Sequence, residues 1–248
     1  MAPACACTRS PRQTGRVNQA PQAVVAARIP GAAALGLVPP PAAEVVPATM
    51  LADPAWTAAR LASRARQQGS ADRRVLATVW WYSASTVLLT PPLAGLVAGV
   101  PLSGRLEDIS ISLLPGGLPT AAVAAAGGKD LAGDVRDSLA AVITAVAEAG
   151  RMRERPLWAI ATDSLANQLL TLGRALGDVP AVTAQARPLA AAIGAPLPEP
   201  RYVDVAGARF TRRASCCLMY LLPGQPLCTS CPRRAAAERQ ILLEGLGL

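Results

Sequence analysis

The hydrophobic and polar positions in the central part of the chain follow a helical period. Asp53-Pro54 has the form of a helix start, an N-cap residue followed by proline at the first helical position, and this helix should end near Gly69. A second helix is expected to begin at residues 70–72 and to continue through Val87. Pro91-Pro92 should break it, because proline removes a backbone donor and crowds the preceding turn.

A shorter stretch alternates apolar and polar side chains and predicts a strand at Leu106–Leu114. Pro115-Gly116-Gly117 then forms a turn, and Thr120–Ala126 can return as the partner strand of a β-hairpin. Tyr202–Val205 has the pattern of another short strand, followed by a turn at Gly207.

Further helices are expected between these strands. One is capped by Asp130 and ends at Gly150, another runs from Pro156 to Gly177, and a shorter one lies near Val182–Ile193. The predicted fold class is therefore α+β, predominantly helical, with a small antiparallel β-hairpin or sheet and a C-terminal cysteine-rich, cluster-binding segment.

Three regions of the chain differ in composition. Residues 1–50 contain eight prolines and no aromatic residue, which predicts a disordered, low-complexity tail. Cys5 and Cys7 lie in this tail and receive no role. Residues 51–200 are expected to form the mostly helical domain, and residues 201–248 the cluster-binding segment.

The segment Val75–Gly104 has no charged residue and is long enough to suggest a membrane span. Pro91-Pro92 divide it into halves shorter than the ~20 residues that a span needs. We therefore favour a buried core helix. Trp80-Trp81-Tyr82 should belong to this core, with one member facing a cleft, because consecutive helical residues cannot all point the same way.

Composition excludes several classes of chemistry. The 248 residues are 52% hydrophobic but only 3% aromatic, so the core must consist mostly of Ala, Leu and Val. There is no histidine, which removes Ser-His-Asp and Cys-His triads, His-ligated haem and His-containing zinc sites. Lys129 is the only lysine and no nucleotide-binding glycine motif follows a strand, so P-loop, Schiff-base and dinucleotide chemistry have little support.

The net charge of +8 is concentrated towards the C-terminus, where residues 201–248 contain seven Arg and three acidic residues. Such a basic region is typical of proteins that meet nucleic acid, an acidic membrane surface or a small anionic ligand. No interleaved aromatic and basic pattern is present, so we expect no nucleic-acid partner. Arg28 and Pro30 interrupt the apolar stretch Ala23–Val38, which makes it a poor signal peptide and favours a cytoplasmic protein.

The most informative pattern is C-C-x10-C-x2-C, which places four of the six cysteines within 16 residues: Cys216, Cys217, Cys228 and Cys231. Adjacent cysteines are poor disulfide partners and chelate a single zinc ion awkwardly. A [2Fe–2S] cluster offers four thiolate positions on two irons. We therefore favour this cluster, with Cys228 and Cys231 on one iron and Cys216 and Cys217 on the other. A four-cysteine zinc site stays open as the alternative.

Four arginines flank the cysteines: Arg212, Arg213, Arg233 and Arg234. Positive charge would stabilise a reduced cluster and attract an anionic chelate, although solvated charges beside a cluster would look the same in the sequence. Pro232 is expected to open a helix that runs to about Glu244 and directs its N-terminus at Cys231.

The run Arg-x-Ser-Cys-Cys-x-x-Tyr-x-x-Pro-Gly followed by Cys-x-x-Cys-Pro resembles the C-terminal signature of FhuF-type ferric-siderophore reductases. Here the run consists of Arg213, Ser215, Cys216, Cys217, Tyr220, Pro223, Gly224, Cys228, Cys231 and Pro232. The resemblance implies a [2Fe–2S] cluster bound by all four cysteines and one-electron reduction of siderophore-bound Fe(III) in the cytoplasm.

The expected partners are an anionic ferric siderophore and an external electron donor, and peripheral contact with a membrane is left open. Two other functions compete with the reductase. One is an interaction protein whose C-terminus is held together by zinc, and the other is a [2Fe–2S] electron carrier or sensor without a chelate site.

Overall fold

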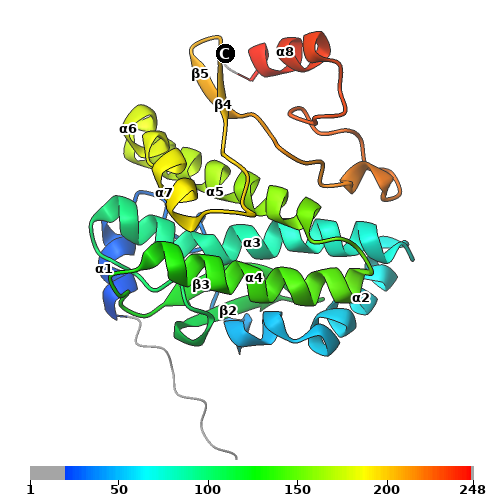
Figure 1. Ribbon diagram of the computed structural model, residues 1–248, viewed down its shortest axis with the longest axis horizontal. Coiled ribbons are helices and arrows are strands. Elements are labelled where there is room, and N and C mark those ends of the chain that lie inside the picture. The colour runs from blue at the N-terminus through cyan, green and yellow to red at the C-terminus, as the bar shows by residue number, and fades with distance from the viewer. Residues whose placement is uncertain (1–19, 247–248) are drawn as a thin grey trace, which may run out of the picture.

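The computed structural model describes residues 20–246. Three long helices, α3 (Arg73–Ala98), α4 (Leu131–Gly150) and α5 (Arg155–Leu176), form the body of the molecule together with α2 (Pro54–Gln68). Figure 1 shows these helices running across the molecule, with the C-terminal segment lying above α5. The predicted α+β class, mainly helical with small antiparallel sheets, is confirmed.

The helix boundaries follow the capping signals of the sequence. The Asp53 carboxylate accepts hydrogen bonds from the first backbone N–H groups of α2, and Gly69 ends this helix with a φ of 60°. Asp72 caps α3 in the same way. The Asp130 carboxylate accepts from the Gly133 N–H at the start of α4, as predicted.

The prediction that Pro91-Pro92 end the second helix is wrong, since both prolines lie inside α3. This part of α3 is buried against the neighbouring helices and the sheet, so apolar burial outweighs the local cost of the missing N–H donors. Within residues 20–246, none of the helices combines the length and the apolar character needed to span a bilayer.

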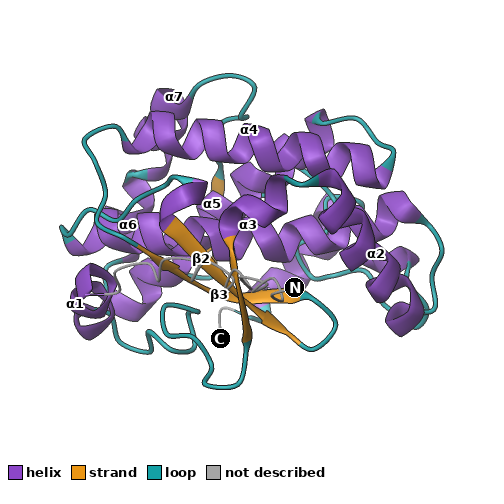
Figure 2. Cartoon of the chain, turned by 90° about the horizontal axis from the view of Figure 1, so that it is seen from below, coloured by secondary structure: helices purple, strands orange, loops and turns teal. Residues whose placement is uncertain are grey.

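A three-stranded antiparallel sheet covers one side of the helices (Figure 2). The strands β2 (Ile109–Leu114) and β3 (Leu118–Ala124) form the predicted hairpin, and a 3-10 turn (η2, Leu106–Asp108) precedes it. Ile109, Ile111 and Leu113 turn their side chains into the core. A third strand, β1 (Glu44–Pro47), pairs with the free edge of β2.

The prediction of a disordered tail over residues 1–50 is wrong for residues 20–50, which include α1 (Ala20–Arg28) and β1. Gln22 is buried, donates to the carbonyls of Leu37 and Ala122 and accepts from the Ala124 N–H. The proline-rich composition suggested disorder, but the apolar side chains between the prolines pack against α3 and β3. Cys5 and Cys7 lie outside the described residues.

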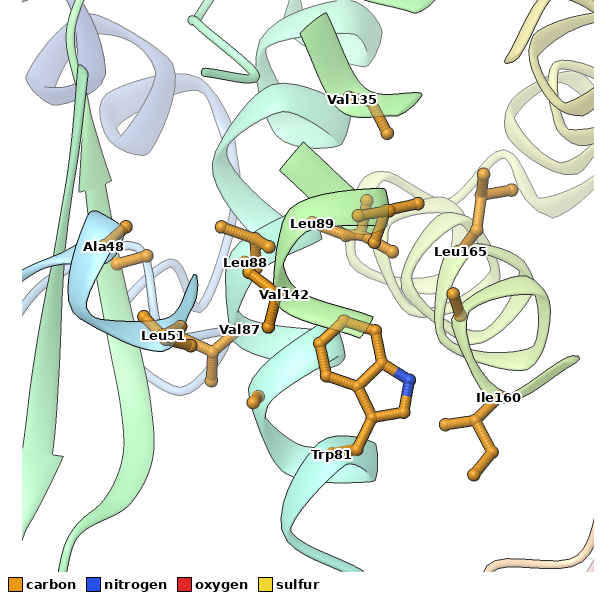
Figure 3. Packing of buried hydrophobic residues seen from close by; sticks show 14 of the residues in the cluster. Ala48, Leu51, Trp81, Val87, Leu88, Leu89, Val135, Val142, Ile160 and Leu165 are labelled. Carbon is orange, nitrogen blue, oxygen red and sulfur yellow. The ribbon is translucent and has the colours of Figure 1, made fainter. Parts of the chain in front are cut away.

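The core is centred on Trp81, whose side chain is fully buried and donates from Nε1 to the Leu157 carbonyl at 2.9 Å. Figure 3 shows this indole among aliphatic side chains from several elements. They include Leu51 from the 3-10 turn η1 (Ala48–Ala52) and Val142 from α4. As the composition predicts, Leu, Val and Ala dominate this core.

The chain after α5 is built from short elements. Two helices, α6 (Val179–Ala184) and α7 (Ala186–Ile193), replace the single helix predicted there. The predicted strand β4 (Tyr202–Val205) pairs with β5 (Ala208–Thr211) through a tight turn at Gly207, whose φ is 79°. The 3-10 turn η3 (Met219–Leu221) and α8 (Ala236–Glu244) complete the described chain. The domain division at residue 200 stays a prediction.

Candidate metal centre

The backbone after β5 reverses direction and brings the two cysteine pairs together. Leu218 adopts a left-handed conformation with a φ of 60°, and the one-turn η3 follows it. The Gln225 N–H then donates to the Leu222 carbonyl across the predicted Pro223-Gly224 turn. The Cys231 N–H donates to the Cys228 carbonyl at 3.1 Å, which forms a compact loop between the last two cysteines.

The four sulfurs form two close pairs. The Sγ atoms of Cys216 and Cys231 lie 3.9 Å apart. The Cys228 thiol is hydrogen-bonded to the sulfur of Cys217. Each pair therefore combines one member of the adjacent cysteines with one member of the CxxC loop, which differs from the pairing that the spacing suggested.

This donor set fits a two-iron cluster. All four cysteines are free thiols, and soft thiolates are the ligands that iron–sulfur clusters require. Among residues 20–246, no three His, Cys, Asp or Glu side chains converge on a position for a single metal ion. The sulfurs instead form two pairs, and a two-iron cluster takes two thiolates on each metal.

The thiols differ in acidity and in exposure. The hydrogen bond from Cys228 lowers the pKa of Cys217 to about 5, and the nearby Arg213 lowers it further. The same hydrogen bond, together with burial, raises the pKa of Cys228, and burial raises the pKa of Cys216. Cys217 is thus better prepared than Cys216 or Cys228 to bind metal as a thiolate at neutral pH. Cys231 and Cys217 are buried, whereas Cys228 is exposed.

Arg213 is the cation nearest to the sulfurs, and its side chain is only 5% exposed. Its Nη1 atom lies 3.4 Å from Cys228 Sγ and 3.8 Å from Cys217 Sγ. The guanidinium stacks over the ring of Tyr82 on α3 at 5.0 Å, and its Nε lies 3.5 Å from the Asp163 carboxylate on α5. Arg213 therefore links one sulfur pair to the helical body.

Asp163 holds the backbone that leads into the adjacent cysteines. Its carboxylate is 1% exposed and accepts the N–H groups of Ala214 at 2.6 Å and Ser215 at 3.1 Å. Burial raises the pKa of Asp163 to about 6, although these hydrogen bonds and Arg213 act in the opposite direction. Sequence reasoning missed this residue. The available signal was that Asp163 is the only acidic residue within α5.

The aromatic triplet on α3 divides as the helical geometry predicts. Trp80 and Trp81 are buried in the core. Tyr82 faces the C-terminal segment, where Arg213 stacks on its ring and its hydroxyl accepts a hydrogen bond from Asn167. Tyr82, the one member of the triplet that is only partly buried, is therefore covered by Arg213.

The other three predicted arginines have different positions. Arg234 donates to the carbonyls of Leu227 and Cys228, so it stabilises the loop backbone and lies away from open solvent. Arg233 is exposed and stacks over Tyr220 at 5.3 Å. Arg212 is exposed beside Arg213.

The prediction of a helix that starts at Pro232 is wrong, since α8 begins at Ala236. The intervening residues form a turn in which the Arg234 N–H donates to the Cys231 carbonyl. The side chain of Arg234 reaches back to the preceding loop and holds the chain in this turn. The first residue of α8 therefore lies five positions after Cys231 and does not follow it directly.

Two cavities lie on either side of the segment that precedes the cysteines. One has a volume of about 330 Å³ and is lined by Pro198, Arg201 and Asp163, and the other, of about 200 Å³, is lined by Ser230 and Arg239. Arg212 and Arg213 line both cavities. The smaller cavity is basic, because Arg212, Arg213 and Arg239 line it without a carboxylate, whereas Asp163 and Glu199 offset the arginines of the larger one.

Four thiols gathered in two pairs beside a buried guanidinium are a ligand set that suits an iron–sulfur cluster, here within an α+β fold. Residues 213–233 match the family described as the FhuF 2Fe-2S C-terminal domain. The chain thus contains a FhuF-type [2Fe–2S] domain, the resemblance seen in the sequence is confirmed, and a [2Fe–2S] cluster is its cofactor. No curated protein sequence matches the chain.

Proposed function

We propose that this protein reduces siderophore-bound Fe(III) to Fe(II) in the cytoplasm, through a [2Fe–2S] cluster held by Cys216, Cys217, Cys228 and Cys231. The observation that carries the proposal is the gathering of these four sulfurs in two pairs within the FhuF-type segment. The substrate is an anionic ferric siderophore, and an external donor supplies the electron.

The chemistry requires one electron for each iron released. Siderophores hold Fe(III) through hard oxygen donors, and Fe(II) is held much more weakly because it is softer and less charged. Reduction of Fe(III) to Fe(II) by one electron therefore releases the metal. The bound cluster supplies the one-electron chemistry. No proton has to move in this step, so a chain without histidine can perform it.

The residues of the chain would position the cluster and the substrate. Cys228 is the exposed sulfur ligand, so it offers the most direct route from the cluster to a chelate at the surface. Arg213 supplies a buried positive charge beside it. The cavities lined by Arg212 and Arg213, together with the positive charge of residues 201–248, favour the approach of an anionic chelate.

The test uses protein purified without oxygen. We expect a visible absorption that dithionite bleaches and an EPR signal in the reduced state. Adding an anionic ferric chelate such as ferric citrate should reoxidise the cluster, while a ferrous-specific chelator traps Fe(II) in equal amount. Colourless protein with stoichiometric zinc would contradict the proposal. A cluster that is reduced normally but not reoxidised by ferric chelates would instead indicate a carrier or sensor.

Substitution of a ligand tests the assignment of the four cysteines. Cys228→Ala should lose bound iron and sulfide, because alanine leaves one iron without its fourth ligand. Cys5→Ser is the matched control and should retain full iron and sulfide content. Loss of iron from the Cys5 variant, or a full cluster in the Cys228 variant, would overturn the assignment.

A further inference from the structure

The structure also shows how the four sulfurs are distributed between two irons. We infer that Cys216 and Cys231 bind one iron and Cys217 and Cys228 bind the other, and that the iron held by the second pair receives the electron. This inference rests on the four-cysteine ligation proposed above and extends it to the arrangement of the ligands.

The distances between the sulfurs support the crossed pairing. Tetrahedral metal–thiolate bonds of about 2.3 Å place two sulfurs of one metal about 3.8 Å apart. The Sγ atoms of Cys216 and Cys231 lie 3.9 Å apart, which matches that spacing. Sulfurs on different irons must be farther apart, because two metals and their bridging sulfides lie between them.

The second pair is also joined by direct interactions. Cys228 is hydrogen-bonded to Cys217, and one atom of Arg213, Nη1, contacts both of their sulfurs. In both pairs, the direct interaction therefore joins one of the adjacent cysteines to one cysteine of the CxxC loop.

The position of the cysteines along the backbone also supports the crossed pairing. Cys216 and Cys217 are consecutive residues outside any helix, and the sulfur of Cys216 lies beside Cys231 while that of Cys217 lies beside Cys228. Two such thiolates reach two different metals more easily than they chelate one. The CxxC loop then supplies one further ligand to each iron, since Cys231 lies beside Cys216 and Cys228 beside Cys217.

The crossed pairing makes the two irons unequal. The guanidinium–sulfur contacts recorded within residues 20–246 both involve the pair Cys217 and Cys228. This pair also contains the exposed sulfur, whereas Cys231 in the other pair is 1% exposed. An added negative charge is stabilised most by the nearest cation. The iron held by Cys217 and Cys228 should therefore be the one that is reduced and that faces the substrate.

Mössbauer spectroscopy of oxidised, ⁵⁷Fe-labelled holoprotein can distinguish the pairings. The double variant C216S/C231S should show two unlike ferric sites, one with four sulfur ligands and one with two oxygens. The matched variant C228S/C231S should show two like sites, each with three sulfurs and one oxygen. The opposite result would establish the pairing of sequence neighbours and overturn the inference.

Redox titration tests which iron is reduced. Serine oxygen stabilises the ferric state, so C217S/C228S should have a lower midpoint potential than C216S/C231S, although both carry two serines. The reverse order would overturn this part of the inference. If the serine variants lose iron, an anaerobic crystal structure of the wild-type holoprotein would show directly which two cysteines bind each iron. Iron and sulfide analysis of the unsubstituted protein separates a failure of the inferred pairing from a failure of the proposed four-cysteine ligation, because without that ligation the protein would contain no cluster.

Discussion

Replacing Arg213 with methionine should lower the midpoint potential of the cluster by about 120 mV. The Nη1 atom lies 3.4 and 3.8 Å from two ligand sulfurs, and a metal–sulfur bond of about 2.3 Å places the positive charge about 6 Å from the nearer iron. At an effective dielectric constant of about 20, a unit charge at this distance stabilises one added electron by about 3 kcal/mol. For a one-electron couple, this energy corresponds to about 120 mV.

The midpoint potentials of wild type and variants can be measured by anaerobic titration, followed by visible absorption and EPR. Arg212→Met is the matched control, because it removes the neighbouring but exposed arginine and should shift the potential much less. Arg213→Lys should retain most of the wild-type value, since it keeps a positive charge at the site. Equal potentials for Arg213→Met and Arg212→Met would refute the assignment of Arg213 as the charge that stabilises the reduced cluster.

Two further predictions concern stability. Burial raises the pKa of Asp163 to about 6, so the folded state binds this proton more tightly than the unfolded state does. The unfolding free energy should therefore fall by about 2–3 kcal/mol as the pH rises from about 4 to about 6, and urea unfolding of iron-free Asp163→Asn should lack this slope. Gln22→Ala should destabilise the protein by about 3 kcal/mol or more, because it leaves the carbonyls of Leu37 and Ala122 and the Ala124 N–H buried without partners. An unchanged urea midpoint for Gln22→Ala would show that residues 20–50 do not contribute to the core.

The features that the sequence predicted correctly depend on neighbouring residues. Asp53 and Asp130 cap their helices through contacts within three residues, and the hairpin of β2 and β3 follows from alternation around a glycine turn. The cysteine constellation is also local, since its members lie within 16 residues. Such signals are readable because the interacting groups are fixed by chain geometry alone.

The errors arise where distant parts of the chain decide the structure. Pro91-Pro92 remain in a helix because α4, α5 and the sheet surround it, and Gln22 becomes ordered through strand β3, about 100 residues away. The pairing of the sulfurs depends on how the loop closes after Leu218. This residue has a left-handed backbone conformation that the sequence pattern did not predict. The sequence pattern gives little indication of the role of Asp163, because the backbone groups that it binds lie about 50 residues further along the chain.

The helical body therefore contributes more than a support for the C-terminal segment. A peptide of residues 213–233 would carry all four thiols, but it would lack the Asp163 carboxylate that fixes the backbone before Cys216 and the Tyr82 ring that covers Arg213. In such a peptide Arg213 would be solvated, and water would screen most of its interaction with the added electron. Because Arg213 is buried between α3 and α5, we expect the potential of the cluster to depend both on the segment that binds it and on the helices beneath it.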